Sequence, residues 1–138
     1  MPFALDPRLA ADTYDIGELP LSRLLLMDDA RYPWLILVPR IAGARELIDL
    51  DSNDRNVLLD EVSAVGFALE EWLRPDKLNI AALGNVVAQL HLHVIARTTI
   101  DAAWPQPVWG HGERVAYTAA QASERVGVLR HALQAKLA

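Results

Sequence analysis

The stretch Gln89–Ile95, which reads Gln-Leu-His-Leu-His-Val-Ile, carries the most informative pattern in the sequence. Successive side chains of a β-strand point to opposite faces, so the two leucines and the valine share one face and are expected to press onto helices. Gln89, His91 and His93 then lie together on the other face. Two of the four histidines of the chain are therefore presented one strand repeat apart, which indicates a chemical site.

Apolar periodicity and turn residues on either side of this stretch predict an α+β domain. In chain order, the expected elements are a short helix from Asp6 to about Asp12, strands at Leu21–Met27 and Trp34–Val38, a long helix from Asp51 or Ser52 to about Arg74, strands at Lys77–Leu83 and Leu90–Arg97, and a final helix that begins at the capping box Thr118–Gln121. The first two strands can pair as a hairpin, and Gly84-Asn85 is expected to be the turn between the last two. Strands joined by short turns favour a mostly antiparallel sheet with helices on one side.

The composition fits one domain that spans residues 1–138. Apolar residues make up 52% and charged residues 22%, which is typical of a globular chain. The net charge is −5 and no block of lysine and arginine occurs, so nucleic acid and anionic membranes are poor partners, although a single nucleotide needs only local donors. The chain has no cysteine, no apolar stretch of membrane length and no signal-peptide pattern at its start, so the expected location is the cytoplasm.

The run from Gly84 to Arg97 resembles the signature of the histidine triad (HIT) superfamily, which is His-φ-His-φ-His-φ-φ, with φ apolar, after a Gly-Gln-Ser/Thr turn. Residues Leu24–Pro39 are similar to the family's apolar strand, acidic or amide residue, proline-containing turn and second strand, so the resemblance spans about Leu21–Arg97. It implies a mostly antiparallel five-stranded sheet with two main helices, and a homodimer with a continuous sheet. It also implies a nucleotide-binding hydrolase or transferase that acts at an α-phosphate.

The resemblance gives the residues of the histidine face catalytic roles. His91 matches the central histidine of the family, the nucleophile that forms a nucleotidyl-histidine intermediate. His93 matches the third histidine, which donates hydrogen bonds to phosphate oxygens. Gln89 stands where the family has its first histidine; an amide cannot carry a proton, but it can still orient the nucleophile. Val86 replaces a hydroxyl residue that bonds phosphate in relatives.

Four further residues are candidate substrate-binding groups. Asp28 stands where relatives hold the ribose hydroxyls, and Asn85 matches an amide that contacts the phosphates; each is alternatively an ordinary turn residue. Asn79, on the strand before the histidine strand, is also expected to reach the site. Arg97 ends the histidine strand on the same face, where it is a candidate phosphate donor or a solvated surface residue.

Three functions stay open. The first is a HIT-type enzyme that cleaves a dinucleoside polyphosphate or a nucleoside phosphoramidate. The second is a non-catalytic nucleotide-binding or regulatory module, which the residues Gln89 and Val86 favour. The third is a metal-dependent enzyme built on the His-x-His pair. A metal would need further ligands, and His111 is the only other histidine nearby in the sequence, so no metal or other cofactor is expected.

Overall fold

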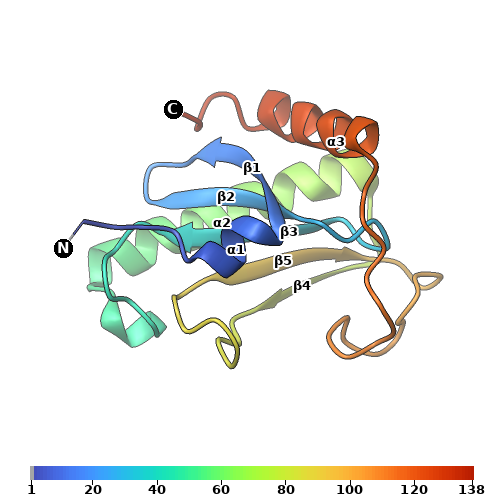
Figure 1. Ribbon diagram of the computed structural model, residues 1–138. Helices are drawn as coiled ribbons and strands as arrows, with labels where there is room; N and C mark the ends of the chain where they lie inside the picture. The colour runs from blue at the N-terminus through green and yellow to red at the C-terminus, as the bar shows by residue number, and fades with distance from the viewer. Residues whose placement is uncertain (1) are drawn as a thin grey trace.

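Five antiparallel strands form one sheet in the computed structural model, which describes residues 2–138 (Figure 1). The elements in chain order are α1 (Pro7–Ala11), β1 (Thr13–Glu18), β2 (Ser22–Met27), β3 (Trp34–Pro39), the short 3₁₀ turn η1 (Leu47–Asp49), α2 (Ser52–Leu73), β4 (Lys77–Ala81), β5 (Leu92–Arg97) and α3 (Ala119–Ala132). The strands are arranged in the order β1-β2-β3-β5-β4, so β5 lies inside the sheet and β4 lies at an edge. The predicted α+β class and the predicted β2–β3 hairpin are both confirmed.

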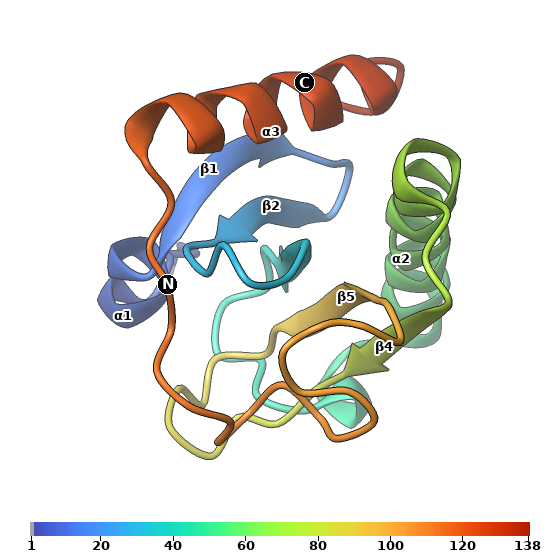
Figure 2. The ribbon, with the colours of Figure 1, turned by 90° about the vertical axis from the view of Figure 1, so that its right-hand side faces the viewer.

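The two long helices, α2 and α3, cover the same face of the sheet (Figure 2). Leu90, Leu92 and Val94 lie in the cluster of buried side chains between the sheet and these helices. Leu69 of α2 and Leu129 of α3 are at most 1% exposed in that cluster. Burial of apolar surface contributes about 25 cal/mol per Å², so this layer fixes β5 firmly from behind.

The opposite face of the sheet is covered by α1, the N-terminal segment and the loop 98–110. Apolar side chains from these segments pack with Trp34, Ile36 and Ile95 in a second, smaller cluster. Because Ile95 has the same strand parity as His91 and His93, both histidines lie on this face. The alternation that the sequence predicts is confirmed: apolar residues face the long helices and the histidines face away from them.

Capping residues explain where the long helices begin and end. Asp51 accepts a backbone N–H at the start of α2, and Arg74 adopts the left-handed conformation just before Pro75 ends the helical run. Thr118 and Gln121 form the reciprocal capping box that starts α3. These ends agree with the ones that the sequence predicts.

The strand β1 is an element that the sequence pattern alone does not predict. Its residues do not alternate cleanly between apolar and polar, and its pairing with β2 shifts register between Asp15 and Gly17. Glycine and a bulge both weaken the usual strand signal. The segment becomes a strand because β2 offers it a partner along its whole length.

The connection between β4 and β5 is longer than the expected Gly84-Asn85 turn. β4 ends at Ala81 and β5 begins at Leu92, so the residues between them do not join the ladder. The backbone N–H of Leu90 instead donates to the carbonyl of Ala44, 2.9 Å away. The prediction of a tight turn is wrong because contacts outside the hairpin hold this connection open.

Within residues 2–138, none of the helices combines the length and the apolar character that crossing a membrane requires.

Candidate active site

His91 directly precedes β5 and His93 is the second residue of that strand. Their side chains lie next to each other. Their ring centroids are 4.9 Å apart, with the rings close to perpendicular. Only 7% of His91 and 4% of His93 is exposed. The structure therefore brings together the two imidazoles that the sequence places on one face.

A backbone hydrogen bond fixes the orientation of His91. Nδ1 of His91 is 2.7 Å from the carbonyl oxygen of Gln89, and a carbonyl oxygen can only accept. Nδ1 must therefore carry the proton, which leaves a free lone pair on Nε2 in the neutral ring. The group that orients His91 is thus the main chain of Gln89 and not its side chain. An imidazole in this form has a nitrogen ready to attack an electrophile.

His93 has the opposite arrangement. The indole Nε1–H of Trp34 donates to Nδ1 of His93 over 2.9 Å, so the neutral ring carries its proton on Nε2. Burial, helped by the charge of the neighbouring His91, lowers the pKa of His93 from 6.5 to about 3. His93 is therefore a neutral N–H donor at any physiological pH.

Two tryptophans enclose His93. Trp34 from β3 and Trp109 from the loop 98–110 have ring centroids 5.7 and 5.0 Å from the imidazole centroid. The two indoles also meet each other edge to face, with centroids 5.6 Å apart. Aromatic side chains exclude water while leaving polar edges available. This enclosure accounts for the burial that keeps His93 uncharged.

The side chain of Gln89 holds the N-terminal segment. Its Nε2 donates to the carbonyl of Ala4 and its Oε1 accepts the backbone N–H of Asp6, both over 2.8 Å. Arg8 pairs with the carboxylate of Asp6 at 3.2 Å and donates to the carbonyl of Val86 at 3.0 Å. The amide that stands at the position of the family's first histidine is therefore a clamp between the start of the chain and the histidine strand.

Asp6 lies close enough to His91 for the charge of that ring to act on its carboxyl. Hydrogen bonds from Arg8 lower the pKa of the Asp6 carboxyl, and the charge of His91 lowers it further by a smaller amount. Nothing in the sequence pattern singles out this residue, since it reads as the cap of a five-residue helix. Contacts between segments more than eighty residues apart along the chain put it there.

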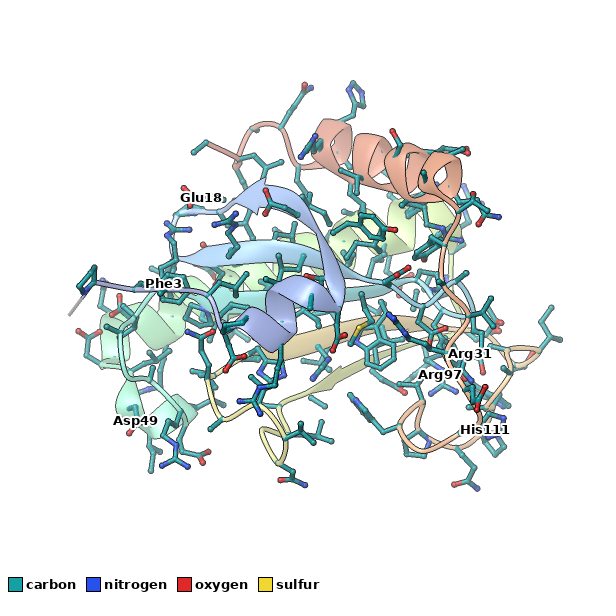
Figure 3. All side chains as sticks on the ribbon, in the orientation of Figure 1. Phe3, Glu18, Arg31, Asp49, Arg97 and His111 are labelled. Carbon is teal, nitrogen blue, oxygen red and sulfur yellow. The ribbon has the colours of Figure 1, made fainter. Side chains whose placement is uncertain are left out.

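Arg97 and Asn79 meet each other at the far end of β5. The Arg97 guanidinium donates to both carboxylate oxygens of Asp101, at 2.7 and 3.0 Å, to Asn79 Oδ1 at 2.8 Å and to the Gln106 carbonyl at 2.8 Å. Arg97 is 2% exposed (Figure 3 marks its place on the sheet). Four of the five guanidinium N–H groups thus already donate to protein groups and the side chain is buried, so Arg97 serves its own loop before any phosphate. The arrangement anchors the loop 98–110 that carries Trp109.

Asp28 and Asn85 lie in different surroundings. The carboxylate of Asp28 accepts the backbone N–H of Tyr117 at 2.9 Å and lies 3.5 Å from the Arg114 guanidinium. It thereby joins the end of β2 to the segment that leads into α3. Asn85 is exposed in the connection between β4 and β5. Neither residue is hydrogen bonded to the histidine pair, and the structure does not gather all the candidate substrate-binding residues around it.

Trp34 is the functional residue that sequence reasoning missed. The β3–β5 register pairs Ile36 with His93, so Trp34 is the diagonal neighbour on the same face, within reach of a long side chain. The sequence of the strand Trp34–Pro39 shows which residues share a face with Trp34. It does not show which residue of β5 lies beside Trp34. The part of the chain that the structure describes holds no group of three or more His, Asp or Glu residues placed to bind a metal ion.

Comparison with known proteins places this site in a family. A family model for the HIT domain matches residues 8–100. The structure is similar to histidine triad proteins from Bradyrhizobium japonicum (50% identity, 100% of both chains, TM-score 0.93), Marinobacter aquaeolei (46%, 99% of both chains, 0.95) and Sinorhizobium meliloti (41%, 95% of this chain and 97% of that chain, 0.92). No curated protein matches the chain. The family model covers all five strands, the histidine strand included, and the fold agrees throughout, so the chain belongs to the histidine triad (HIT) family.

Proposed function

We propose that the protein is a HIT-type nucleotide hydrolase or nucleotidyl transferase. It cleaves a nucleotide conjugate, either a dinucleoside polyphosphate or a nucleoside phosphoramidate, at the α-phosphate. The observation that carries this proposal is the pair of opposite tautomers: a free lone pair on Nε2 of His91 beside an N–H on Nε2 of His93. One ring can attack phosphorus while the other donates to the oxygens that gain charge.

The proposed reaction has two steps. Nε2 of His91 attacks the α-phosphorus, a P–N bond forms and the bond to the leaving group breaks, with water supplying the proton to the leaving group. Water then attacks the same phosphorus and gives a proton to the hydroxide left from the first step. The P–N bond breaks, and neutral His91 is restored with release of the nucleoside monophosphate. Splitting one displacement into two lowers the barrier of each. His93 and nearby backbone amides stabilise the charge on the phosphoryl oxygens.

We propose direct contacts to substrate for Asp28 and Asn85 and an indirect role for Asn79 and Arg97. Asp28 keeps spare acceptor capacity, because its recorded contacts are one backbone N–H and a long contact to Arg114. We propose that it binds the ribose hydroxyls and that exposed Asn85 contacts the phosphates. For Arg97 and Asn79 we propose an indirect role, in which they hold the loop 98–110 in place.

A non-catalytic nucleotide-binding module is the second candidate. Two observations favour it: Val86 is 80% exposed without a hydroxyl to offer, and the side chain of Gln89 is engaged by Ala4 and Asp6. Loss of one donor to a developing charge costs about 3 kcal/mol. In either case we propose that a homodimer in the cytoplasm binds a small nucleotide and no nucleic acid.

A turnover assay separates the two candidates. Purified protein is incubated with diadenosine polyphosphates and with aminoalkyl phosphoramidates of adenosine and guanosine, and nucleoside monophosphate is measured. Release of monophosphate by the parent and its loss in His91→Gly, with nucleotide binding retained, is the expected result, because the imidazole serves chemistry more than affinity. Binding without turnover across the panel would favour the second candidate.

A further inference from the structure

The hydrogen bond from Trp34 to His93 stands out among the contacts of the site. It joins two side chains that are 5% and 4% exposed, and it crosses from β3 to β5 within the second cluster of apolar side chains. An indole N–H can only donate. The bond therefore exists only while Nδ1 of His93 is without a proton.

This restriction decides what His93 can do. A doubly protonated ring would bring two N–H groups face to face at 2.9 Å, and the other neutral tautomer would do the same. Only the ring with its proton on Nε2 keeps the bond. The tautomer of a histidine is commonly set by the partner of its other nitrogen.

We propose that Trp34 is a positioning residue, which locks His93 as the uncharged Nε2–H donor and so keeps one hydrogen bond aimed at the substrate phosphate. The inference rests on the proposed function for the identity of the substrate, but the lock itself is a property of the free protein. Without it, His93 could turn a lone pair toward the phosphate oxygens, which would repel them. It could also become a cation 4.9 Å from the ring of His91.

The charged groups around His93 do not favour a second proton on its ring. Across the sheet it faces Ile36 of β3 and Ala81 of β4, neither of which titrates. The titratable neighbours on its face are His91 on one side, the Arg97–Asp101 pair toward the end of β5, and Tyr32, whose ring packs against Trp34. Burial raises the pKa of the Tyr32 hydroxyl, so this group stays neutral. Beyond His91, the N-terminal segment adds the Asp6–Arg8 pair. Each acid is matched by an arginine, so His93 has no unpaired carboxylate to draw a second proton to it.

The chain offers a matched pair of variants. Trp34→Phe removes the indole N–H and keeps most of the aromatic bulk, whereas Trp109→Phe changes the other aromatic neighbour, 5.0 Å from the imidazole centroid, and leaves the bond in place. Proton–nitrogen NMR spectra of the ¹⁵N-labelled imidazoles, recorded over a pH series, report the tautomer and the pKa of His93 without any substrate. Turnover of the same proteins with the best substrate of the panel reports the consequence.

In the parent and in Trp109→Phe, we expect His93 in the Nε2–H form throughout the neutral range, with a pKa near 3 in the parent. In Trp34→Phe the Nδ1–H form should appear. The pKa should also rise, because the neutral ring loses a hydrogen-bond donor, while the remaining burial still holds it below 6.5. kcat should then fall by about tenfold or more, as when a catalytic histidine loses its correct tautomer, and a new step should enter the pH profile below neutrality.

An Nδ1–H tautomer of His93 in the parent would overturn the proposal on its own, even if Trp34→Phe fails to fold. An unchanged tautomer and pKa in a folded Trp34→Phe would overturn it as well. A protein with the expected spectra but without turnover would support the lock and contradict the enzymatic function, so the two failures are distinguishable.

Discussion

At the scale of single residues, two hydrogen bonds of 2.7 and 2.9 Å set the chemistry of the histidine pair. A main-chain carbonyl takes the Nδ1 proton of His91, and an indole occupies Nδ1 of His93. The two rings have the same covalent structure and lie one pleat apart, yet one presents a base and the other a donor. Their partners alone make the difference.

The stability of the protein should carry a signature of buried His93. Its pKa is about 3 in the folded protein against 6.5 for an ordinary histidine. Between these values the unfolded chain binds a proton that the folded chain does not, so the contribution is fully present above pH 6.5 and is lost as the pH falls toward 3. The free energy of unfolding should decline by up to about 1.4 kcal/mol per pH unit from this residue alone.

Urea unfolding of the parent and of His93→Asn, at intervals between pH 6.5 and 4.5, tests this expectation. The parent should lose stability more steeply than the variant, whatever their difference at neutral pH. Carboxyls with a lowered pKa, such as those of Asp29 and Asp101, start from 3.8 and act mainly below this window, equally in both proteins. Parallel stability curves would show that His93 does not bind a proton on unfolding.

Residue parity could be predicted from the sequence, but hydrogen-bond partners could not. Alternation along a strand puts His91 and His93 on one face whatever lies beside them. That Trp34 reaches His93 depends on the β3–β5 register, and that Gln89 reaches Ala4 depends on where the N-terminal segment packs. Both contacts join residues more than fifty positions apart, and nothing local specifies them.

At the scale of elements, the N-terminal segment and the connection 82–91 form one unit around the entrance to β5. Gln89 makes two hydrogen bonds to the segment, and Arg8 makes one to the connection. α1 has only five residues and would not be stable as a free helix. It is held by these bonds and by burial of Leu9, which is 4% exposed.

Changing Gln89 to Glu should loosen this unit. The new carboxylate can still accept the N–H of Asp6, but it has no proton to donate to the carbonyl of Ala4 and lies near the Asp6 carboxylate. Backbone amides of α1 should exchange with deuterium faster in Gln89→Glu than in the parent, with little change in α2. The exposed residue Gln134 provides the control, since Gln134→Glu makes the same change of charge far from the clamp. Equal exchange in all three proteins would show that the side chain of Gln89 does not hold α1 in place.

Helices whose ends are marked by capping side chains could be predicted from the sequence. Segments whose structure depends on contacts with another segment could not. Asp51 and Thr118 mark the starts of α2 and α3 because their side chains bond backbone N–H groups within one turn. β1 has no such mark, and its bulge and Gly17 break the alternation. It is a strand because of β2. The prediction of a tight turn in the connection 82–91 is wrong for the same reason, since the contacts that hold this connection come from Ala44 and Arg8.

At the scale of the whole molecule, the edge of the sheet formed by β4 has no further strand paired to it in this chain. β4 is an edge strand, and Ile80 on it is 53% exposed on the side of the sheet that α2 covers. Phe67 of α2 is 75% exposed, and the turn before it packs on β4, where Gly66 approaches Leu78. An open strand edge beside exposed apolar side chains is a surface for pairing with a second copy. The other edge, β1, is partly covered, because the N–H of Ala138 bonds the carbonyl of Glu18.

We therefore expect a dimer through α2 and β4. Sedimentation velocity at micromolar concentration should show a dimer for the parent and a monomer for Ile80→Arg and for Phe67→Glu, because a buried charge without a partner opposes association. Val115→Arg is the control: Val115 is 52% exposed in the segment before α3, away from β4. A monomeric parent, or a dimer that survives both interface substitutions, would contradict this assembly.

The overall architecture followed from the resemblance of one short motif more than from the periodicity of the chain. The strand pattern alone indicated four strands and an antiparallel sheet, whereas the likeness of Gly84–Arg97 to the HIT signature implied five. The family model matches residues 8–100, and the similar structures confirm that fold over the whole chain.

During turnover, Nε2 of His91 should become covalently bonded to phosphorus. Mixing the protein with a reactive nucleotide conjugate, quenching in alkali, under which P–N bonds survive, and measuring the intact mass tests it directly. The parent should gain the mass of one nucleoside monophosphoryl group, peptide mapping should place it on His91, and His91→Gly should gain none. An adduct on His93, or brisk hydrolysis by His91→Gly, would contradict the account.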